Sequence, residues 1–134
     1  MAVTTIIDDE RKLVVHRLQG ELQLEDIILA LRKFYSSESV PDYPILWDLQ
    51  EASLLSLELD EIQKFSDATK SFWPSMKKGK TALLVTSEGD FGIARMFQIL
   101  SEGIPREIKV FRDQREALDW MRSGRPEKGR RRQE

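Results

Sequence analysis

Residues 80–103, KTALLVTSEGDFGIARMFQILSEG, form the stretch that decides the fold of this chain. The apolar run over 80–86 is typical of a strand that is buried on both faces of a sheet. Residues 87–92 form a polar turn with two glycines. Apolar residues at helical spacing follow, and they predict a helix over 91–100. A strand, a tight turn and a helix in this order make half of a βαβ unit, so the stretch predicts an α/β fold.

The rest of the chain predicts the other elements of the same fold. The expected elements are, in chain order, strands over 3–8 and 12–18, a helix over 24–36, a strand over 43–47, a helix over 57–73, the strand and helix described above, a strand over 107–112 and a helix over 113–121. Each connection after the first hairpin contains a helix, so those strands are expected to be parallel and only the first antiparallel. The predicted fold class is a single α/β domain of order β-β-α-β-α-β-α-β-α with a mixed, mostly parallel sheet.

Residue types that cap helices mark the expected helix starts. Ser56 is the expected N-cap of the helix over 57–73, which Trp73 and Pro74 should end. Asp113 and Glu116 have the spacing of a capping box for the last helix. The strand before it alternates apolar with charged residues, which favours a position at a sheet edge.

Length and composition limit the chain to one domain. It has 134 residues, of which 40% are hydrophobic and 33% charged, so it can bury a core. Residues 1–123 are expected to form the domain. Residues 124–134 hold five basic and two acidic residues and predict a disordered basic tail. The tail therefore carries a net charge of 5 − 2 = +3. Because the formal net charge of the whole chain is −2, the body carries −2 − 3 = −5, and an acidic body disfavours nucleic-acid binding.

The composition also bears on location. There is no cysteine, which excludes disulfides, zinc-finger spacings and a cysteine nucleophile and favours a reducing compartment. No apolar run approaches the ~20 residues that cross a bilayer. The first residues lack the basic and apolar segments of a signal peptide. The expected location is the cytoplasm, without a membrane span.

Polar residues near the ends of the predicted parallel strands are the candidates for function. Ligands of open α/β sheets bind outside the carboxyl ends of the strands. The candidate ligand or partner surface consists of Asp48, Ser56, Ser87, Glu88, Asp90, Phe91 and Met96. Asp48 and Asp90 would serve as general acid and base if one of them were desolvated. The other interpretation is that Asp48 caps a loop and Asp90 caps the following helix.

No cofactor, metal or catalytic residue is predicted. His16 is the only histidine and belongs to no metal-ligand motif, so a structural position in a strand is expected. The helix start around Gly89 and Gly92 would attract an anion. However, Glu88 and Asp90 place negative charge there, and neither a Walker lysine nor a GxGxxG spacing is present.

Two aromatic residues and one helix bear on possible contacts. Trp73 and Phe91 are at element ends, where they either close the core or line an apolar pocket or a subunit contact. The helix over 91–100 has apolar residues around more than one stripe. A homodimer contact would bury such a surplus, so a homodimer is predicted.

Several motifs resemble the STAS-type domain of bacterial anti-sigma-factor antagonists. The resemblance is greatest to the small SpoIIAA-like bacterial proteins of unknown function, which are grouped with CRAL-TRIO lipid-binding domains. The motifs are Gly20-Glu21-Leu22, Trp47-Asp48-Leu49, Gly92-Ile93-Ala94-Arg95-Met96-Phe97, Val110-Phe111-Arg112-Asp113 and Glu116-Ala117-Leu118-Asp119-Trp120. The resemblance covers residues 3–121 and implies a SpoIIAA-like fold in a bacterial protein.

One segment departs from the pattern of that family. Regulatory STAS domains carry a phosphorylatable serine in an Asp-Ser-Ser/Thr-Gly turn at the start of a helix. The corresponding segment here, Leu55-Ser56-Leu57-Glu58, has the serine without the preceding aspartate or the following glycine. The resemblance therefore implies no phosphoserine switch at Ser56.

Three hypotheses for function remain open from the sequence. The preferred one is a non-enzymatic binding or regulatory module that acts through protein contacts. The alternatives are a carrier of a small apolar or lipid-like ligand, which the CRAL-TRIO likeness implies, and a small hydrolase or isomerase that uses Asp48 or Asp90. An enclosed apolar pocket beside Phe91 and Met96 would favour the carrier, whereas a solid interior with an exposed apolar patch would favour protein contacts.

Overall fold

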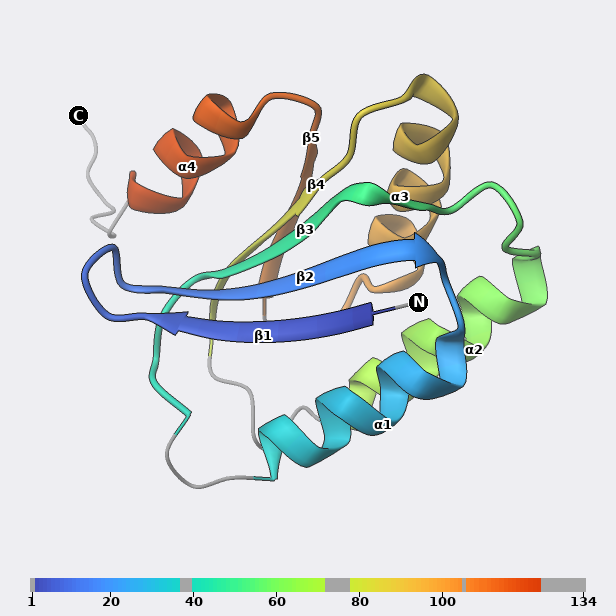
Figure 1. Cartoon of the computed structure of the whole chain (residues 1–134), viewed down its shortest axis with the longest axis horizontal. Coiled ribbons are helices and arrows are strands. Elements are labelled where there is room, and N and C mark those ends of the chain that lie inside the picture. Colours follow the sequence, from blue (N-terminus) through green and yellow to red (C-terminus); the bar gives the residue numbers. More distant parts are fainter. Residues whose placement is uncertain (1, 37–39, 72–77, 105, 124–134) are drawn as a thin grey trace.

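A computed structural model describes residues 2–36, 40–71, 78–104 and 106–123 (Figure 1). The elements are β1 (Ala2–Asp8), β2 (Leu13–Glu21), α1 (Leu24–Tyr35), β3 (Ile45–Ser53), α2 (Leu59–Lys70), β4 (Gly79–Leu84), α3 (Glu88–Leu100), β5 (Arg106–Phe111) and α4 (Gln114–Arg122). This is the order that the sequence predicted. The expected basic tail at 124–134 lies outside the described residues. The helix expected to reach Trp73 ends earlier, at Lys70, with Ser71 as its C-cap; Trp73 and Pro74 themselves lie outside the described residues.

The five strands form one sheet whose spatial order follows the chain, β1-β2-β3-β4-β5. β1 pairs antiparallel with β2, and every later pair of neighbours is parallel. Both features confirm the predicted fold class. β5 is an edge strand, as the alternation of apolar and charged residues predicted, and β1 is the other edge.

The helices cover the two faces of the sheet unequally. α1, α2 and α3 lie on one face and α4 alone lies on the other (Figure 1). The main core, under the three helices, includes Val14, Leu31, Trp47, Leu83 and Val110. The smaller core, under α4, includes Leu13, Val15, Leu46, Phe111 and Met121. Because α4 packs mainly on β4 and β5, we call the α4 side of β1, β2 and β3 the open face.

His16 is a core residue of β2. It is fully buried, and its Nδ1 lies 2.9 Å from the Thr5 hydroxyl oxygen while its Nε2 lies 2.9 Å from the Tyr35 hydroxyl oxygen. The rings of Phe34 and Trp47 also pack against it. Burial lowers the pKa of His16 to about 3, so the imidazole is neutral in the folded protein.

β3 is longer than the sequence predicted. The expected strand over 43–47 is in fact Ile45–Ser53, so Asp48 lies inside the strand and not at its end. The reason is a β-bulge: Arg17 pairs with Asp48 but Gln19 pairs with Glu51, so three residues of β3 span the length of two on β2. The extra residue breaks the alternation of apolar and polar residues by which a strand is recognised.

Two helix starts also differ from prediction. α2 begins at Leu59, and the Glu61 carboxylate accepts a hydrogen bond from the backbone N–H of Glu58, so Ser56 is not its cap. α3 begins at Glu88, three residues before the predicted start, because the Ser87 hydroxyl accepts a hydrogen bond from the backbone N–H of Asp90. The Asp113 carboxylate caps α4 by accepting a hydrogen bond from the backbone N–H of Glu116, which is one half of the predicted capping box.

Candidate functional site

A tight turn connects β3 to α2 at the carboxyl end of the sheet. The backbone N–H of Leu57 donates to the carbonyl oxygen of Leu54 at 3.0 Å, which closes the turn. Leu54 is buried, and Leu57 packs against the main core beside it. The two residues between them, Leu55 and Ser56, are exposed. The turn therefore places one leucine and one hydroxyl in solvent on a backbone that is fixed from beneath.

Asp90 holds this turn to the start of α3. Its carboxylate, only 5% exposed, accepts a hydrogen bond from the backbone N–H of Leu54 at 3.1 Å. The sequence suggested that Asp90 caps its own helix, but that task belongs to Ser87. The carboxylate instead satisfies a buried backbone donor in a segment 36 residues away.

Leu55 lies directly over Gly89 in the first turn of α3. A Cβ atom added at Gly89 would be 2.7 Å from Cδ2 of Leu55, so no larger residue fits beneath the leucine in its present position. Leu55 is nevertheless 64% exposed, because only its inner side touches α3. Near it along the chain, Leu59 at the start of α2 is 62% exposed. We call Leu55, Ser56 and Leu59 the turn surface.

The other candidates from the sequence are distributed around α3. Ser87 and Glu88 are exposed at its start, just before Gly89, over which Leu55 lies. Phe91 is half-buried and packs against the main core. Met96 is more than a turn further along the helix and 37% exposed. The structure thus brings Asp90 beneath the turn, whereas Ser87 caps α3 and Met96 lies further along that helix.

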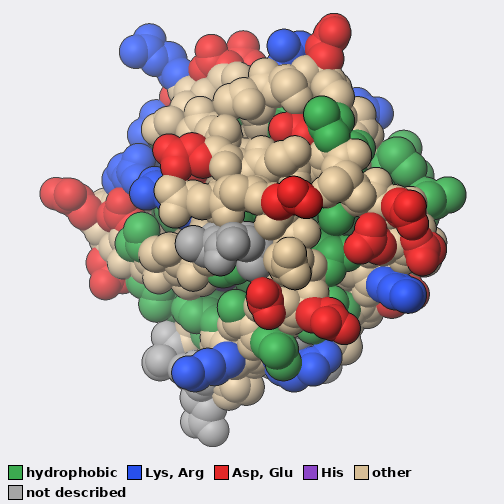
Figure 2. All heavy atoms as spheres, turned by 45° about the vertical axis from the view of Figure 1, so that its right-hand side comes forward, with side chains coloured by type: hydrophobic (Ala, Val, Ile, Leu, Met, Phe, Trp, Pro, Cys, Tyr) green, Lys and Arg blue, Asp and Glu red, His purple; other side chains and the backbone are tan. Residues whose placement is uncertain are grey.

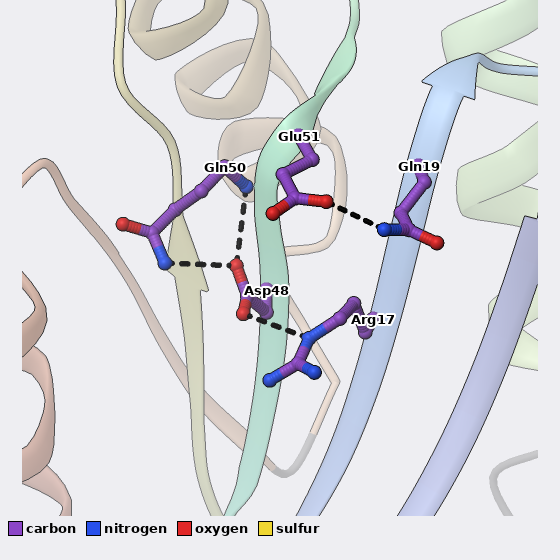
Figure 3. A network of polar contacts seen from close by, with 5 residues as sticks. All are labelled: Arg17, Gln19, Asp48, Gln50 and Glu51. Carbon is purple, nitrogen blue, oxygen red and sulfur yellow. Dashed lines mark hydrogen bonds and ion pairs between the residues drawn. The ribbon is translucent and has the colours of Figure 1, made fainter.

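Asp48 belongs to a separate polar network on the open face (Figure 3). Its carboxylate forms an ion pair with Arg17 at 3.2 Å and accepts hydrogen bonds from the backbone and side-chain N–H groups of Gln50. Gln19 donates to the Glu51 carboxylate beside it. The β-bulge makes this arrangement possible, because it puts Asp48 and Glu51 on one face of β3. Asp48 and Asp90 therefore have different structural partners.

An open hollow adjoins the turn surface. Its lining residues are Gly20, Glu21, Gln50, Glu51, Ala52, Ser53, Leu55 and Ser56. Among these described residues two are acidic and none is basic. Glu58 and Glu88, both exposed, add negative charge in the segments that flank the turn and Gly89. Figure 2 shows this side of the molecule, with acidic side chains standing among apolar and polar ones across its middle.

The interior holds a small apolar cavity between the sheet and the three helices. Its volume is about 60 Å³. The residues that line it within the described part of the chain are all apolar: Leu18, Leu22, Leu24, Ile27, Trp47, Leu49, Leu54, Leu57, Ile62, Phe65, Leu83, Ile93, Ala94 and Phe97. Neither Phe91 nor Met96, beside which a ligand pocket was considered, is among them. The buried side of the turn, Leu54 and Leu57, forms part of its wall.

The sequence missed the residues that make this site distinctive. Leu55 falls between the strand predicted over 43–47 and the helix predicted over 57–73, and Leu59 falls in the first turn of that predicted helix. An exposed leucine has no signal of its own. The spacing of Leu54, Leu55 and Leu57 is the signal that could have indicated the site, because a tight turn points neighbouring leucines in different directions and so exposes one of them. Among the described residues, no group of histidine and acidic side chains is placed to hold a metal ion. Within the same ranges, no helix combines the length and the apolar character that crossing a membrane requires.

Comparison with known proteins identifies the fold. No protein-family model matches the sequence, and no curated protein is significantly similar to it. The structure is similar to the crystal structure of an uncharacterized protein of the DUF3478 family with a SpoIIAA-like fold from Shewanella loihica PV-4. The TM-score is 0.59 and the sequence identity 20%, over 90% of this chain and 92% of the other. At this identity the similarity establishes the architecture, which agrees with the resemblance seen in the sequence motifs: the chain has a SpoIIAA-like fold.

Proposed function

We propose that this chain is a binding module that acts through protein contacts at the turn surface. The observation that carries the proposal is Leu55, which is 64% exposed on a turn held in place by a buried carboxylate. Fully burying an exposed leucine is worth about 1.5–3 kcal/mol, which is the upper bound for covering the exposed part of Leu55. A side chain whose backbone is already fixed loses less conformational entropy on binding, so more of that free energy remains as affinity.

The charges around the turn surface support one kind of partner. Glu21 and Glu51 line the adjoining hollow, Glu58 follows the turn, and Glu88 precedes Gly89, over which Leu55 lies. Such a field attracts basic groups and repels acidic ones. The partner is therefore a protein segment with an apolar side chain for Leu55 and with lysine or arginine residues beside it.

The same charges argue against a phosphoserine switch at Ser56. The hydroxyl is exposed, but a phosphate there would add about two negative charges next to carboxylates. Ser56 also lacks the neighbouring aspartate and glycine of the regulatory STAS turn. In this proposal Ser56 is a small, uncharged neighbour of Leu55 and leaves room for the partner.

The size of the cavity favours protein contacts over transport of a ligand. Sites for small molecules usually enclose about 300–1,000 Å³, whereas this cavity holds about 60 Å³. The carrier alternative would require α1, α2 or α3 to move away from the sheet. Native mass spectrometry of the purified protein tests it directly, since a co-purified apolar ligand would support the carrier and contradict the preferred proposal.

The two carboxylates considered for catalysis have structural tasks that support the same proposal. Asp48 is engaged by Arg17 and Gln50 on the open face, and Asp90 by Leu54 under the turn. A general acid and base must act on one substrate from positions within hydrogen-bond reach of it. The enzyme hypothesis is best tested by Asp48→Asn, which keeps the shape of the side chain: an activity that falls a hundredfold in this variant would contradict a non-enzymatic role.

The experiment that tests the binding proposal is selection from a displayed library of random peptides, followed by measurement of the dissociation constant. We expect enrichment of peptides that combine a large apolar residue with two or more basic ones. Leu55→Lys should weaken their binding at least tenfold, and raising the salt concentration should weaken it further. The matched control is Leu29→Lys, because Leu29 on α1 is equally exposed, at 61%. Enriched peptides that bind the Leu55 and Leu29 variants alike would overturn the proposal.

A further inference from the structure

The two edges of the sheet are protected very differently. β5 carries Arg106, Glu107 and Lys109 among its six residues, and charged side chains on an edge strand oppose pairing with another strand. β1 contains no proline, lysine or arginine, and its only charge is Asp8 at the last position. Figure 1 looks onto β1, which crosses the front of the molecule with no other element drawn over it.

The described backbone of β1 is engaged on one side only. All seven of its residues pair with β2, from Ala2 with Gln19 to Asp8 with Leu13. Within the described residues, none of them has a backbone hydrogen bond to a turn or loop. In an edge strand, alternate N–H and C=O groups point away from the partner strand and form a template for another one.

Two isoleucines near the end of β1 are exposed. Ile6 and Ile7 are each 41% exposed, and as neighbours in a strand they point to opposite faces of the sheet. Ile6 is opposite Val15 and lies on the open face, whereas Ile7 lies on the face of α1, α2 and α3. A strand added beside β1 would cover both of them at once.

We propose that β1 pairs with β1 of a second copy of this chain, antiparallel about a two-fold axis, to form a continuous ten-stranded sheet. The occupant is a second copy because the strand is complementary to itself. Only every second residue of β1 points its N–H and C=O groups away from β2. In the pairing of two copies, odd-numbered residues must therefore lie opposite odd-numbered ones, and even-numbered opposite even-numbered. The pairing with the longest overlap then places Thr5 opposite Thr5, Val3 opposite Ile7 and Thr4 opposite Ile6.

This register matches side chains of one kind. Residues 3–7 are all β-branched, and pairs of β-branched residues across strands are among the favourable ones. Each exposed isoleucine gains a β-branched neighbour, and by symmetry each pair occurs twice. Asp8 falls opposite Ala2, so no two like charges face each other. The inference is independent of the proposed binding function, because β1 contributes no residue to the turn surface or to the hollow.

The register can be tested with single cysteine substitutions, because the chain contains no natural cysteine and any disulfide must form between the introduced residues. Thr5→Cys puts two thiols at the two-fold axis, where the Cβ atoms of paired residues are about 4.5–5.5 Å apart, near the distance that a disulfide spans. Thr4→Cys and Ile6→Cys put each thiol on a diagonal, about 7–8 Å from its symmetry mate. We expect rapid oxidation to a disulfide-linked dimer for Thr5→Cys and slow oxidation for the other two. Equal rates for all three would mean random collision and would overturn the proposal.

The oligomeric state gives a second measurement. By sedimentation velocity we expect wild-type protein to be dimeric at tens of micromolar and Ile6→Lys to be monomeric, because lysine on an edge strand opposes pairing. Leu59→Lys is the control, since it adds the same charge on the turn surface and should stay dimeric. A monomeric wild type, or a dimer that Ile6→Lys leaves intact, contradicts the inference. If Ile6→Lys failed to fold, the oxidation rates alone would decide. Loss of peptide binding in Leu59→Lys with the dimer intact would separate the two proposals.

Discussion

The carboxylate of Asp90 and the backbone N–H of Leu54 are joined by a 3.1 Å hydrogen bond between the start of α3 and the turn before α2. This bond fixes the segment that presents Leu55 and Ser56. It is buried, so its loss cannot be compensated by water as easily as on a surface. The position of the turn surface therefore depends on a residue that itself cannot touch a partner.

Asp90→Ala should destabilise the protein by about 1–3 kcal/mol, because it leaves the buried N–H of Leu54 without an acceptor. Asp90→Asn keeps an acceptor oxygen and should cost less. Urea unfolding of the two variants measures the difference. Asp119→Ala, which removes an exposed carboxylate on α4, is the control and should change stability by less than about 0.5 kcal/mol. Equal stability of the Ala variant and the wild type would show that the bond does not hold the turn.

The glycines of α3 offer a test of how Leu55 is positioned. Gly92→Ala meets nothing within 4 Å and should stabilise the helix by about 0.5–1 kcal/mol. Gly89→Ala places a methyl group against Leu55 and forces that side chain to move. We expect Gly89→Ala to weaken peptide binding and Gly92→Ala to leave it unchanged, with both variants folded. If both variants bound peptide like the wild type, the contact between the Leu55 side chain and Gly89 would not matter for peptide binding.

The capping of α2 can be tested by comparing Glu61 with Ser56, the cap that the sequence predicted. Glu61→Ala removes the carboxylate that accepts from the N–H of Glu58 and should cost about 0.5–2 kcal/mol, the usual range for a helix cap. Ser56→Ala removes an exposed hydroxyl that does not cap the helix and should cost less than about 0.5 kcal/mol. Thermal or urea unfolding compares the two. A larger loss for Ser56→Ala would restore Ser56 as the cap.

The sequence predicted the architecture because its signals are repeated in every element. Each strand except β3 has an apolar run or an alternation that remains in phase, and each helix has a stripe of apolar residues. The strand predicted from the sequence ends at Trp47, because the bulge in β3 shifts the alternation of apolar and polar residues after Asp48. The sheet tolerates polar side chains there because the open face lies in solvent, which a single sequence does not reveal.

The candidate site was less predictable than the fold. Asp90 and Ser87 were identified, but their partners were not, because the bond from Asp90 to Leu54 joins residues 36 positions apart. The residue type of Ser56 predicts a cap for α2. In the structure, the Glu61 carboxylate accepts the hydrogen bond from the backbone N–H of Glu58 at the start of that helix instead. Leu55 carries no signal of its own: the spacing of Leu54, Leu55 and Leu57 indicates a turn, but only the geometry of that turn determines which of two adjacent leucines faces solvent.

The burial of His16 makes the stability of the fold depend on pH. The pKa of His16 is lowered by burial from 6.5 to about 3. In the unfolded chain the imidazole takes up a proton near pH 6.5, whereas in the folded protein it does so only near pH 3. Between these values the unfolded state binds more protons, so the free energy of unfolding falls as the pH falls. The contribution of His16 is fully present above pH 6.5 and is lost toward pH 3, at up to about 1.4 kcal/mol per pH unit.

His16→Gln tests this dependence, because an amide can still meet the hydroxyl groups of Thr5 and Tyr35 but does not titrate. Urea unfolding of both proteins between pH 5 and pH 7.5 gives the free energy of unfolding at each pH. We expect the wild type to lose stability relative to the variant as the pH falls below about 6, with a slope that approaches about 1.4 kcal/mol per pH unit. Taking the difference between the proteins removes the contribution of carboxylates, which titrate in both. Parallel curves over this range would show that His16 is protonated equally in the folded and unfolded states, and the neutral, buried imidazole would have to be abandoned.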